Sequence, residues 1–161
     1  MSFESFREEL QRQIPELAAV RVLDHAARGR HLEIQAAGYQ VEAIARAART
    51  SGFFLEAITA VDFTEGPQVM YFFNSYEAPS RVQVRVPMKP GESLPTINRA
   101  YDAALWYERE VFDLFGIRFD NHPDLRRLLL PEDADFFPLR KDFGKVHAFR
   151  SAKEIYDKPG A

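Results

Sequence analysis

The sequence predicts an α+β domain, a mostly antiparallel sheet with helices packed on it, followed by an extended C-terminal tail. Two features predict the domain: stretches in which apolar residues recur every three or four positions, and stretches in which they alternate or run together. Three of the strand-like stretches follow one another directly, which favours antiparallel pairing. The tail is predicted because no long periodic stretch returns after Gly116, although apolar residues continue.

The N-terminal region is predicted to form one helix and two short strands. Apolar residues recur with helical spacing over 3–14, and Pro15 ends that helix. Alternation over 20–22 and again over 32–34 predicts two strands. The residues 26–29 between them suit a hairpin connection.

A second helix and three longer strands are predicted next. Helical spacing covers 39–49, and Gly52 stands where a glycine commonly ends a helix. The residues 53–63 are apolar at nearly every position, which predicts a strand buried on both faces, and 68–74 is a second such run. Alternation over 81–88 predicts a strand with one buried and one solvent-exposed face.

The last predicted helix precedes Gly116, which is expected to stop it. An apolar stripe runs over 97–114, and Pro95 can open a helix near its first position. Asp102 could instead cap a second helix, which would leave a break near Tyr101. Both arrangements remain open on the sequence alone.

The chain is therefore divided into an α+β domain, 1–116, and a tail, 117–161. Segments this long without periodicity are usually functional or disordered. Disorder fits poorly, because the tail carries many leucines and phenylalanines between its prolines. An apolar, extended segment that cannot build its own core is best explained by packing along another surface. The tail is accordingly predicted to be a partner-docking element.

Composition and charge exclude several functions. The net charge of −3 gives no reason to expect nucleic-acid binding, which needs clustered Lys and Arg. The chain has no cysteine, which excludes a disulfide, a thiol nucleophile and an ordinary four-cysteine iron–sulfur site. No run approaches the roughly 18 consecutive apolar residues of a membrane-spanning helix. The N-terminus lacks a signal-peptide pattern, so membrane contact is expected only through partners.

Charged residues are dense on the last predicted helix. Arg109 and Asp113 are four positions apart and can pair on the helix surface. Glu110 falls nearer the apolar Leu114 and would need a partner if it were buried. A solvated helix face is the simpler alternative. The candidate partners from the tail are Arg126, Arg127 and Arg140.

A metal or acid–base site in the same region is a further alternative. Glu108, Glu110, Asp113 and His122 lie close in the sequence, but no His-x3-His or Glu-x2-His pair places two metal ligands on one helical face. A lone histidine in a turn such as 121–124 is more often a hydrogen-bonded structural residue than a catalyst. No catalytic, cofactor-binding or metal-binding residue is therefore predicted.

Three linked motifs now suggest a family. They are WYEREVFDLFGI at 106–117, HPDLRRLL at 122–129 and PLRKDF at 138–143. Together they resemble the signature of the C subunit, of the 30-kDa type, of respiratory complex I (NADH-quinone oxidoreductase), a family that includes the J subunit of photosynthetic NDH complexes. The match is firm over 104–143.

The resemblance implies a structural and assembly subunit in the peripheral arm of a proton-translocating enzyme. Its partners would be the quinone-reducing D subunit and the B and I iron–sulfur subunits, on the cytoplasmic side of a bacterial inner membrane. FMN, iron–sulfur clusters and quinone would belong to partner subunits, and the isolated chain would be non-catalytic. Alternatives are the equivalent subunit of a membrane-bound hydrogenase or ferredoxin-dependent complex, or a stand-alone enzyme that uses the carboxylates.

The resemblance also implies that the charged residues hold the tail or a partner. The residues expected to do so are Glu108, Arg109, Glu110, Asp113, His122, Arg126, Arg127, Arg140 and Lys141.

Overall fold

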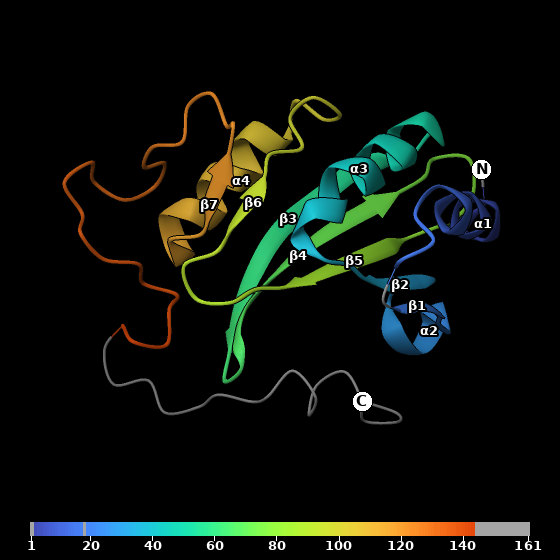
Figure 1. The fold of residues 1–161 in the computed structure, drawn as a ribbon, viewed down its shortest axis with the longest axis horizontal. Coiled ribbons are helices and arrows are strands. Elements are labelled where there is room, and N and C mark those ends of the chain that lie inside the picture. The colour runs from blue at the N-terminus through green and yellow to red at the C-terminus, as the bar shows by residue number, and fades with distance from the viewer. Residues whose placement is uncertain (1, 18, 144–161) are drawn as a thin grey trace.

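The computed structural model describes residues 2–17 and 19–143 (Figure 1). The elements in chain order are α1 (Phe3–Gln13), β1 (Ala19–Val22), α2 (His25–Arg28), β2 (Leu32–Gln35), the 3-10 turn η1 (Gly38–Gln40), α3 (Val41–Thr50), β3 (Phe54–Phe63), β4 (Gly66–Asn74), β5 (Val82–Pro87), β6 (Ser93–Pro95), α4 (Ala104–Phe115) and β7 (Arg118–Asp120).

Five strands form one sheet in the order β1-β2-β5-β4-β3. All neighbours are antiparallel except β2 and β5, which run parallel. The short strands β6 and β7 form a separate parallel pair. The predicted α+β class with a mostly antiparallel sheet is confirmed. The predicted hairpin of β1 and β2 is also confirmed, and its connection contains the single helical turn α2, which Gly29 ends with a φ of 67°.

The core lies between one face of the sheet and the helices α1, α3 and α4. Alternate residues of β2, β4 and β5 face the helices, because successive side chains of a strand point to opposite faces. Phe6 of α1 packs against Phe53 with ring centroids 4.6 Å apart. The sheet residues of this face are almost completely buried, and they are Leu32, Ile34, Val69, Tyr71, Phe73, Val82, Val84 and Val86.

Two strands differ from their predicted burial. The strand β3 is not buried on both faces, since it is the edge strand and Val61 is 36% exposed. The strand β5, which lies between β2 and β4, has no solvent-exposed face. Its polar residues Gln83 and Arg85 are buried, and Arg85 donates to Glu33 of β2 at 3.0 Å. The burial of these strands therefore depends on contacts with distant parts of the chain, which apolar patterning does not reveal.

Glycines mark the C-terminal ends of α3 and α4, whereas the start of α4 differs from the prediction. Gly52, with a φ of 77°, follows α3, as predicted. The continuous helix through 95–116 is wrong, because Pro95 ends β6 and α4 begins only at Ala104. The alternative of two helices with a break near Tyr101 is right only for the later start of α4, since 96–103 contain turns and no helix. Ala103 occupies the N-cap position and no side chain caps it, so the predicted Asp102 cap is wrong. Gly116 ends α4 with a φ of 75°.

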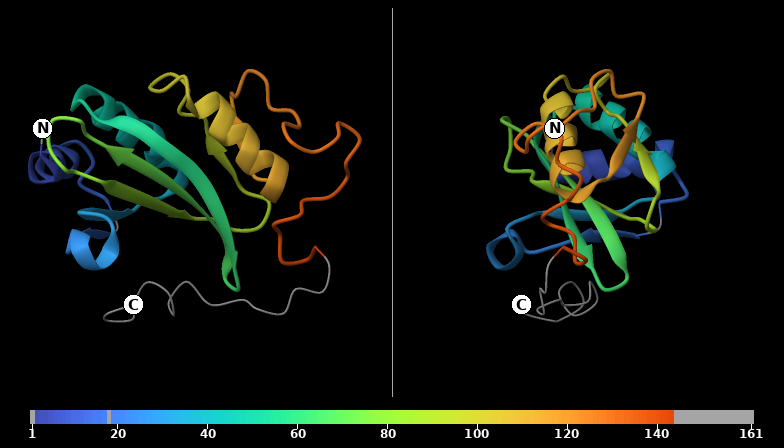
Figure 2. Two further views of the ribbon diagram at one scale, coloured as in Figure 1. Left: turned by 180° about the vertical axis from the view of Figure 1, so that it is seen from behind. Right: turned by 90° about the vertical axis from the view of Figure 1, so that its left-hand side faces the viewer.

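After β7 the tail runs without regular secondary structure along α4 and then toward the β3–β4 turn (Figure 2). Three contacts fix its last described part. The N–H of Leu139 donates to the carbonyl of Leu114 at 3.0 Å. The ring of Phe137 lies so close to Gly116 that an added Cβ would come within 2.9 Å of it. The N–H of Lys141 donates to Asp62 of β3 at 2.8 Å.

The surface along which residues 117–143 pack is thus the chain's own domain. Ile117 and Phe119 belong to the domain core, and Leu125 packs against it. The remainder of the tail, 144–161, lies outside the described residues, and the division at residue 116 stays a prediction. Among the residues that the structure describes, no helix has the length and apolarity to cross a bilayer.

Candidate functional site

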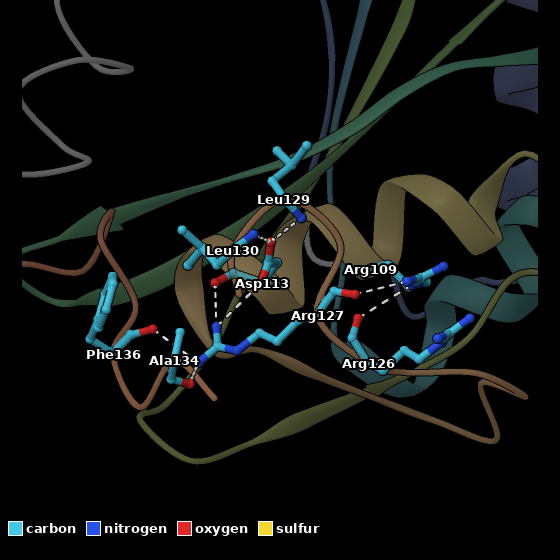
Figure 3. A network of polar contacts seen from close by, with 8 residues as sticks. All are labelled: Arg109, Asp113, Arg126, Arg127, Leu129, Leu130, Ala134 and Phe136. Atoms are coloured by element: carbon cyan, nitrogen blue, oxygen red, sulfur yellow. Dashed lines mark hydrogen bonds and ion pairs between the residues drawn. The ribbon is translucent and has the colours of Figure 1, made fainter. Parts of the chain in front are cut away.

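Two charged residues of α4, Arg109 and Asp113, lie where the tail crosses the helix (Figure 3). Arg109 and Asp113 are one helical turn apart, so they present their side chains to the same side of α4. The guanidinium of Arg109 donates to the carbonyls of Arg126 and Arg127 at 3.3 and 2.9 Å. Arg109 is only 8% exposed. Arg109 therefore holds the tail through the backbone carbonyls of the tail, and its Nη1 also lies 3.8 Å from the carboxylate of Asp124.

Asp113 binds the next turn of the tail. One carboxylate oxygen accepts the N–H groups of Leu129 and Leu130 at 2.7 and 3.0 Å, and the side chain is completely buried. Burial disfavours the charged form, but the N–H groups of 128–130 and the Arg127 side chain outweigh it and hold the pKa of Asp113 below its ordinary value. Asp113 is therefore an ionised carboxylate surrounded by donors.

Arg127 closes the network from the tail side. Its guanidinium donates to the backbone carbonyl and the carboxylate of Asp113 at 2.8 and 3.3 Å. Its other end donates to the carbonyls of Ala134 and Phe136, which gathers the tail into a loop. It also lies 4.5 Å from the ring centroid of Phe137, within the range of a cation–π contact. Arg127 therefore binds α4 and the tail at the same time.

The predicted ion pair between Arg109 and Asp113 is wrong, because each side chain reaches a different part of the tail. The alternative of a solvated helix face is wrong for both residues as well, since the tail covers them. Arg126 and Arg140 behave differently. Both are exposed and pair locally, Arg126 with Asp124 and Arg140 with Asp142, each at 2.9 Å.

Glu108, and not Glu110, is the buried glutamate. Position 108 falls on the side of α4 that faces the domain core, together with Ala104 and Val111, whereas Glu110 is exposed. The carboxylate of Glu108 accepts the hydroxyl of Thr96 at 2.6 Å and the N–H of Ile97 at 2.8 Å. Burial raises the pKa of Glu108 to about 7, against the opposing effect of these two hydrogen bonds. Within the described part of the tail, Arg126, Arg127 and Arg140 make their contacts elsewhere and none of them reaches Glu110, contrary to the expectation.

His122 is a structural residue of the turn that leads into the tail. Its Nε2 lies 3.0 Å from the carbonyl of Leu105, and its Nδ1 accepts the N–H of Asp124 at 3.1 Å. The side chain has no exposed surface. The turn is thereby tied to the first half of α4. The expectation of a hydrogen-bonded histidine agrees with this geometry.

Several residues of the site carry no signal in the sequence. Leu128, Leu129 and Leu130 suggest only an apolar surface, yet their backbone N–H groups hold Asp113 in its charged form. Backbone donors are common to almost every residue, so no motif marks them. Thr96 carries no signal either. A capped or paired carboxylate on α4 could be expected from the charge density, but not the identity of its donors.

The helix α4 and the tail residues 117–143 that pack along it form one unit, the α4–tail unit. Exposed apolar side chains line its outer side. Leu129 is 68% exposed and Leu139 is 50% exposed, although both belong to segments that are fixed to α4. Phe136 and Phe143 are also exposed and stack on each other with centroids 5.3 Å apart. On α4 itself, Trp106 is 62% exposed and lies against Arg109. Fixed, exposed apolar groups of this kind are typical of interaction surfaces.

The arrangement does not resemble a catalytic site. Glu108 points to 96–97, Asp113 points to the tail and Glu110 points to solvent, so the three carboxylates do not converge. Over residues 2–17 and 19–143, no three His, Asp or Glu side chains gather as a metal-binding group would require. The chemistry that this geometry supports is attachment of the tail and presentation of its outer surface.

Comparison with known proteins gives the chain a family context. The C subunit of NADH-quinone oxidoreductase from Dinoroseobacter shibae is 47% identical over 89 residues, which are 53% of this chain and 41% of that protein. The C/D subunit of NADH-quinone oxidoreductase from Aeromonas hydrophila is 45% identical over 83 residues, 51% of this chain and 13% of that protein. The chain thus spans less than half the length of these relatives.

A solved structure extends the likeness over nearly the whole chain. A chain of the membrane-bound sulfane sulfur reductase, an archaeal respiratory membrane complex, matches with a TM-score of 0.73 at 25% sequence identity. The match covers 96% of this chain and 91% of that one. A family sequence model described as "Respiratory-chain NADH dehydrogenase, 30 Kd subunit" matches residues 34–148, most of the chain. The chain therefore belongs to the family of the 30-kDa subunit of respiratory-chain NADH dehydrogenase.

Proposed function

We propose that this chain is a non-redox subunit in the peripheral arm of a proton-translocating NADH:quinone oxidoreductase. Its role is structural: it supports the quinone-reducing D subunit and carries no cofactor. One observation carries the proposal. The charged residues that the family motifs place together are used inside the chain, where Arg109, Asp113 and Arg127 fix the tail to α4. They are not directed at a substrate.

The burial of these charges supports a structural role. Removing charged groups from water is unfavourable by several kcal/mol for each ion unless hydrogen bonds and opposite charges compensate. Here the carboxylate of Asp113 accepts two backbone N–H groups and one guanidinium N–H. A carboxylate whose oxygens are occupied in this way is a poor general base or metal ligand. It is well suited to holding an irregular segment in one conformation.

The fixed tail offers a surface that a partner can cover. Leu129 and Leu139 have most or half of their surface in water, and Trp106 projects from the neighbouring helix. Because the tail is already ordered, a partner that binds it avoids the entropic cost of ordering a flexible segment. We therefore place the docking surface on the outer side of the α4–tail unit.

The D subunit is the partner that we propose for this surface. The Aeromonas hydrophila relative is a C/D subunit by name, so one chain there carries both parts. Covalent linkage keeps two parts at high effective concentration, as expected for units that work side by side. The B and I iron–sulfur subunits are proposed as further neighbours. FMN, iron–sulfur clusters and quinone would then reside in partners, in keeping with a chain that has no cysteine.

On this proposal the chain lies on the cytoplasmic side of a bacterial inner membrane and reaches the membrane only through its partners. A second candidate is the equivalent subunit of a related respiratory complex with another electron donor. The near full-length match to a chain of the archaeal sulfane sulfur reductase complex favours that candidate, whereas the higher sequence identity of the NADH-quinone oxidoreductase relatives favours the first.

Purification of the tagged chain from its own cells tests the proposal. We expect a D-type subunit to co-purify, with iron–sulfur and NADH-binding subunits. Replacing Leu129 with aspartate should weaken recovery of the D subunit, because it places a charge in the docking surface. The matched control is Val22→Asp, since Val22 is 50% exposed on the distant strand β1.

The outcome distinguishes the two candidate complexes and tests the position of the docking surface separately. Co-purification of hydrogenase or ferredoxin-linked subunits would select the second candidate. Equal loss of the D subunit in both variants would contradict the placement of the surface. NADH or quinone turnover by the isolated chain would contradict the non-catalytic role.

A further inference from the structure

A buried polar pair lies at the point where the tail leaves the domain. Glu108 belongs to α4, and His122 follows β7 at the start of the tail. Neither side chain has any exposed surface, and His122 Nε2 lies 3.9 Å from the nearer carboxylate oxygen of Glu108. The pair stands apart from the docking surface proposed above.

The hydrogen bonds of His122 fix its protonation state. Nδ1 faces the N–H of Asp124, which can only donate, so Nδ1 must be the accepting nitrogen. Nε2 faces the carbonyl of Leu105, which can only accept, so Nε2 must carry the proton. Only the neutral ring with its proton on Nε2 satisfies both neighbours. In that form His122 ties the turn to α4.

We propose that His122 is a proton-sensitive latch for the tail: the neutral ring holds the 121–124 turn against α4, and protonation at Nδ1 releases it. A protonated Nδ1 would direct an N–H at the N–H of Asp124, which replaces an attraction with a repulsion. The displacement reaches the tail through Asp124, whose carboxylate lies 2.9 Å from Arg126 Nε and 3.8 Å from Arg109 Nη1.

Glu108 couples to the latch as its nearest titratable group. Burial raises its pKa to about 7, so its charge changes near neutral pH. The ionised carboxylate favours a proton on the imidazole, and the neutral carboxyl does not.

The other groups around the pair do not compete for this proton. Thr96 donates its hydroxyl to Glu108. Burial raises the pKa of Tyr71 on β4 well above its ordinary value, so that phenol stays neutral. Arg109, the next residue of α4, points to the carbonyls of the tail.

Nuclear magnetic resonance of the full chain from about pH 8 to pH 5 tests the latch. The C2 proton of the His122 ring reports its charge, and the Asp124 amide reports the turn. We expect both signals to change over the same pH range. After correction for intrinsic exchange, the amides of 126–130 should exchange roughly tenfold faster with the ring protonated, the factor expected for loss of one buried hydrogen bond.

The decisive variant is His122→Gln, which cannot titrate and should leave the Asp124 amide insensitive to pH. The matched control is His25→Gln, which removes an exposed histidine of α2 and should leave the response unchanged. If His122→Gln does not fold, Glu108→Gln serves: it should remove the step near pH 7 from the ring signal and keep the release of the turn. A ring that stays neutral to pH 5, or that titrates without moving Asp124, would overturn the proposal. That result would not affect the docking proposal, because no partner is present.

Discussion

Replacing Asp113 with asparagine removes the negative charge at the centre of the α4–tail network and keeps the size of the side chain. The carboxylate accepts N–H groups from Leu129, Leu130 and the Arg127 guanidinium. An asparagine has one acceptor oxygen and one NH2 group. If the oxygen keeps the two backbone donors, the NH2 group must face the guanidinium of Arg127, and two donors then meet.

The expected loss follows from these contacts. A hydrogen bond to a charged group contributes about 1.5–3 kcal/mol, and a neutral one about 1 kcal/mol. The substitution removes one charge-assisted bond at Arg127 and weakens two at the backbone. We expect the attachment of the tail to weaken by about 3 kcal/mol, which corresponds to a roughly hundredfold larger fraction of detached tail.

Hydrogen exchange of the amides at 128–130 measures this loss directly, and trypsin cleavage after Arg126 or Arg127 gives an independent reading. Asp133→Asn is the matched control, because Asp133 is an exposed tail aspartate outside the network. If Asp113→Asn left amide exchange within about twofold of that control, the network would not be what fixes the tail. The docking surface, which depends on a fixed tail, would then lose its support.

Three further substitutions probe other parts of the structure. The pKa of Glu108 is raised from 4.5 to about 7, so its stabilising contribution is present below pH 4.5 and is lost as the pH rises through 7. Urea unfolding at several pH values should therefore show that the wild type loses roughly 3 kcal/mol relative to Glu108→Gln between about pH 5 and 8. Gly116→Ala places a Cβ 2.9 Å from the Phe137 ring at a residue whose φ is 75°. We expect the free energy of unfolding to fall by about 1–3 kcal/mol and the tail to be cleaved faster by protease, and an unchanged melting temperature would contradict this. Glu33→Ala removes the carboxylate beside the buried Arg85; chemical unfolding should show a loss of about 3 kcal/mol, and a loss under 1 kcal/mol would show that the pair is dispensable.

The sequence predicts those features of the fold that depend on neighbours in the chain. Gly52 and Gly116 end helices because a left-handed residue is needed there, and glycine adopts that conformation without strain. The break before α4 is one of two alternatives that the sequence leaves open, since Pro95 and Asp102 can each begin a helix. Local preference cannot choose between them, because packing of 97–103 against the domain decides it.

Features that depend on distant partners could not be predicted. Alternation over 81–88 is typical of a half-exposed strand, but β5 is central and Arg85 finds Glu33 on β2, far away in the sequence. The sequence correctly marks the charges of α4 as important for the tail, whereas it does not reveal their pairing. Arg127 is one of the residues expected to hold the tail or a partner, and it donates to the tail carbonyls of Ala134 and Phe136. No pattern in the sequence marks these acceptors, because only the folded tail brings them within reach of the guanidinium.

The parallel pairing of β2 with β5 has a consequence for the order in which the chain folds. Leu32 lies opposite Val82, fifty residues further along, whereas β3 and β4 meet across a tight turn. The chain loses the entropy of closing a long loop before the stabilising contacts between the two strands form. Such pairings therefore form late and slow folding. During synthesis the β1–β2 hairpin emerges before the other strands and waits with an unpaired edge until β5 has left the ribosome. We expect β3 and β4 to form early and the insertion of β5 beside β2 to be the step that limits folding.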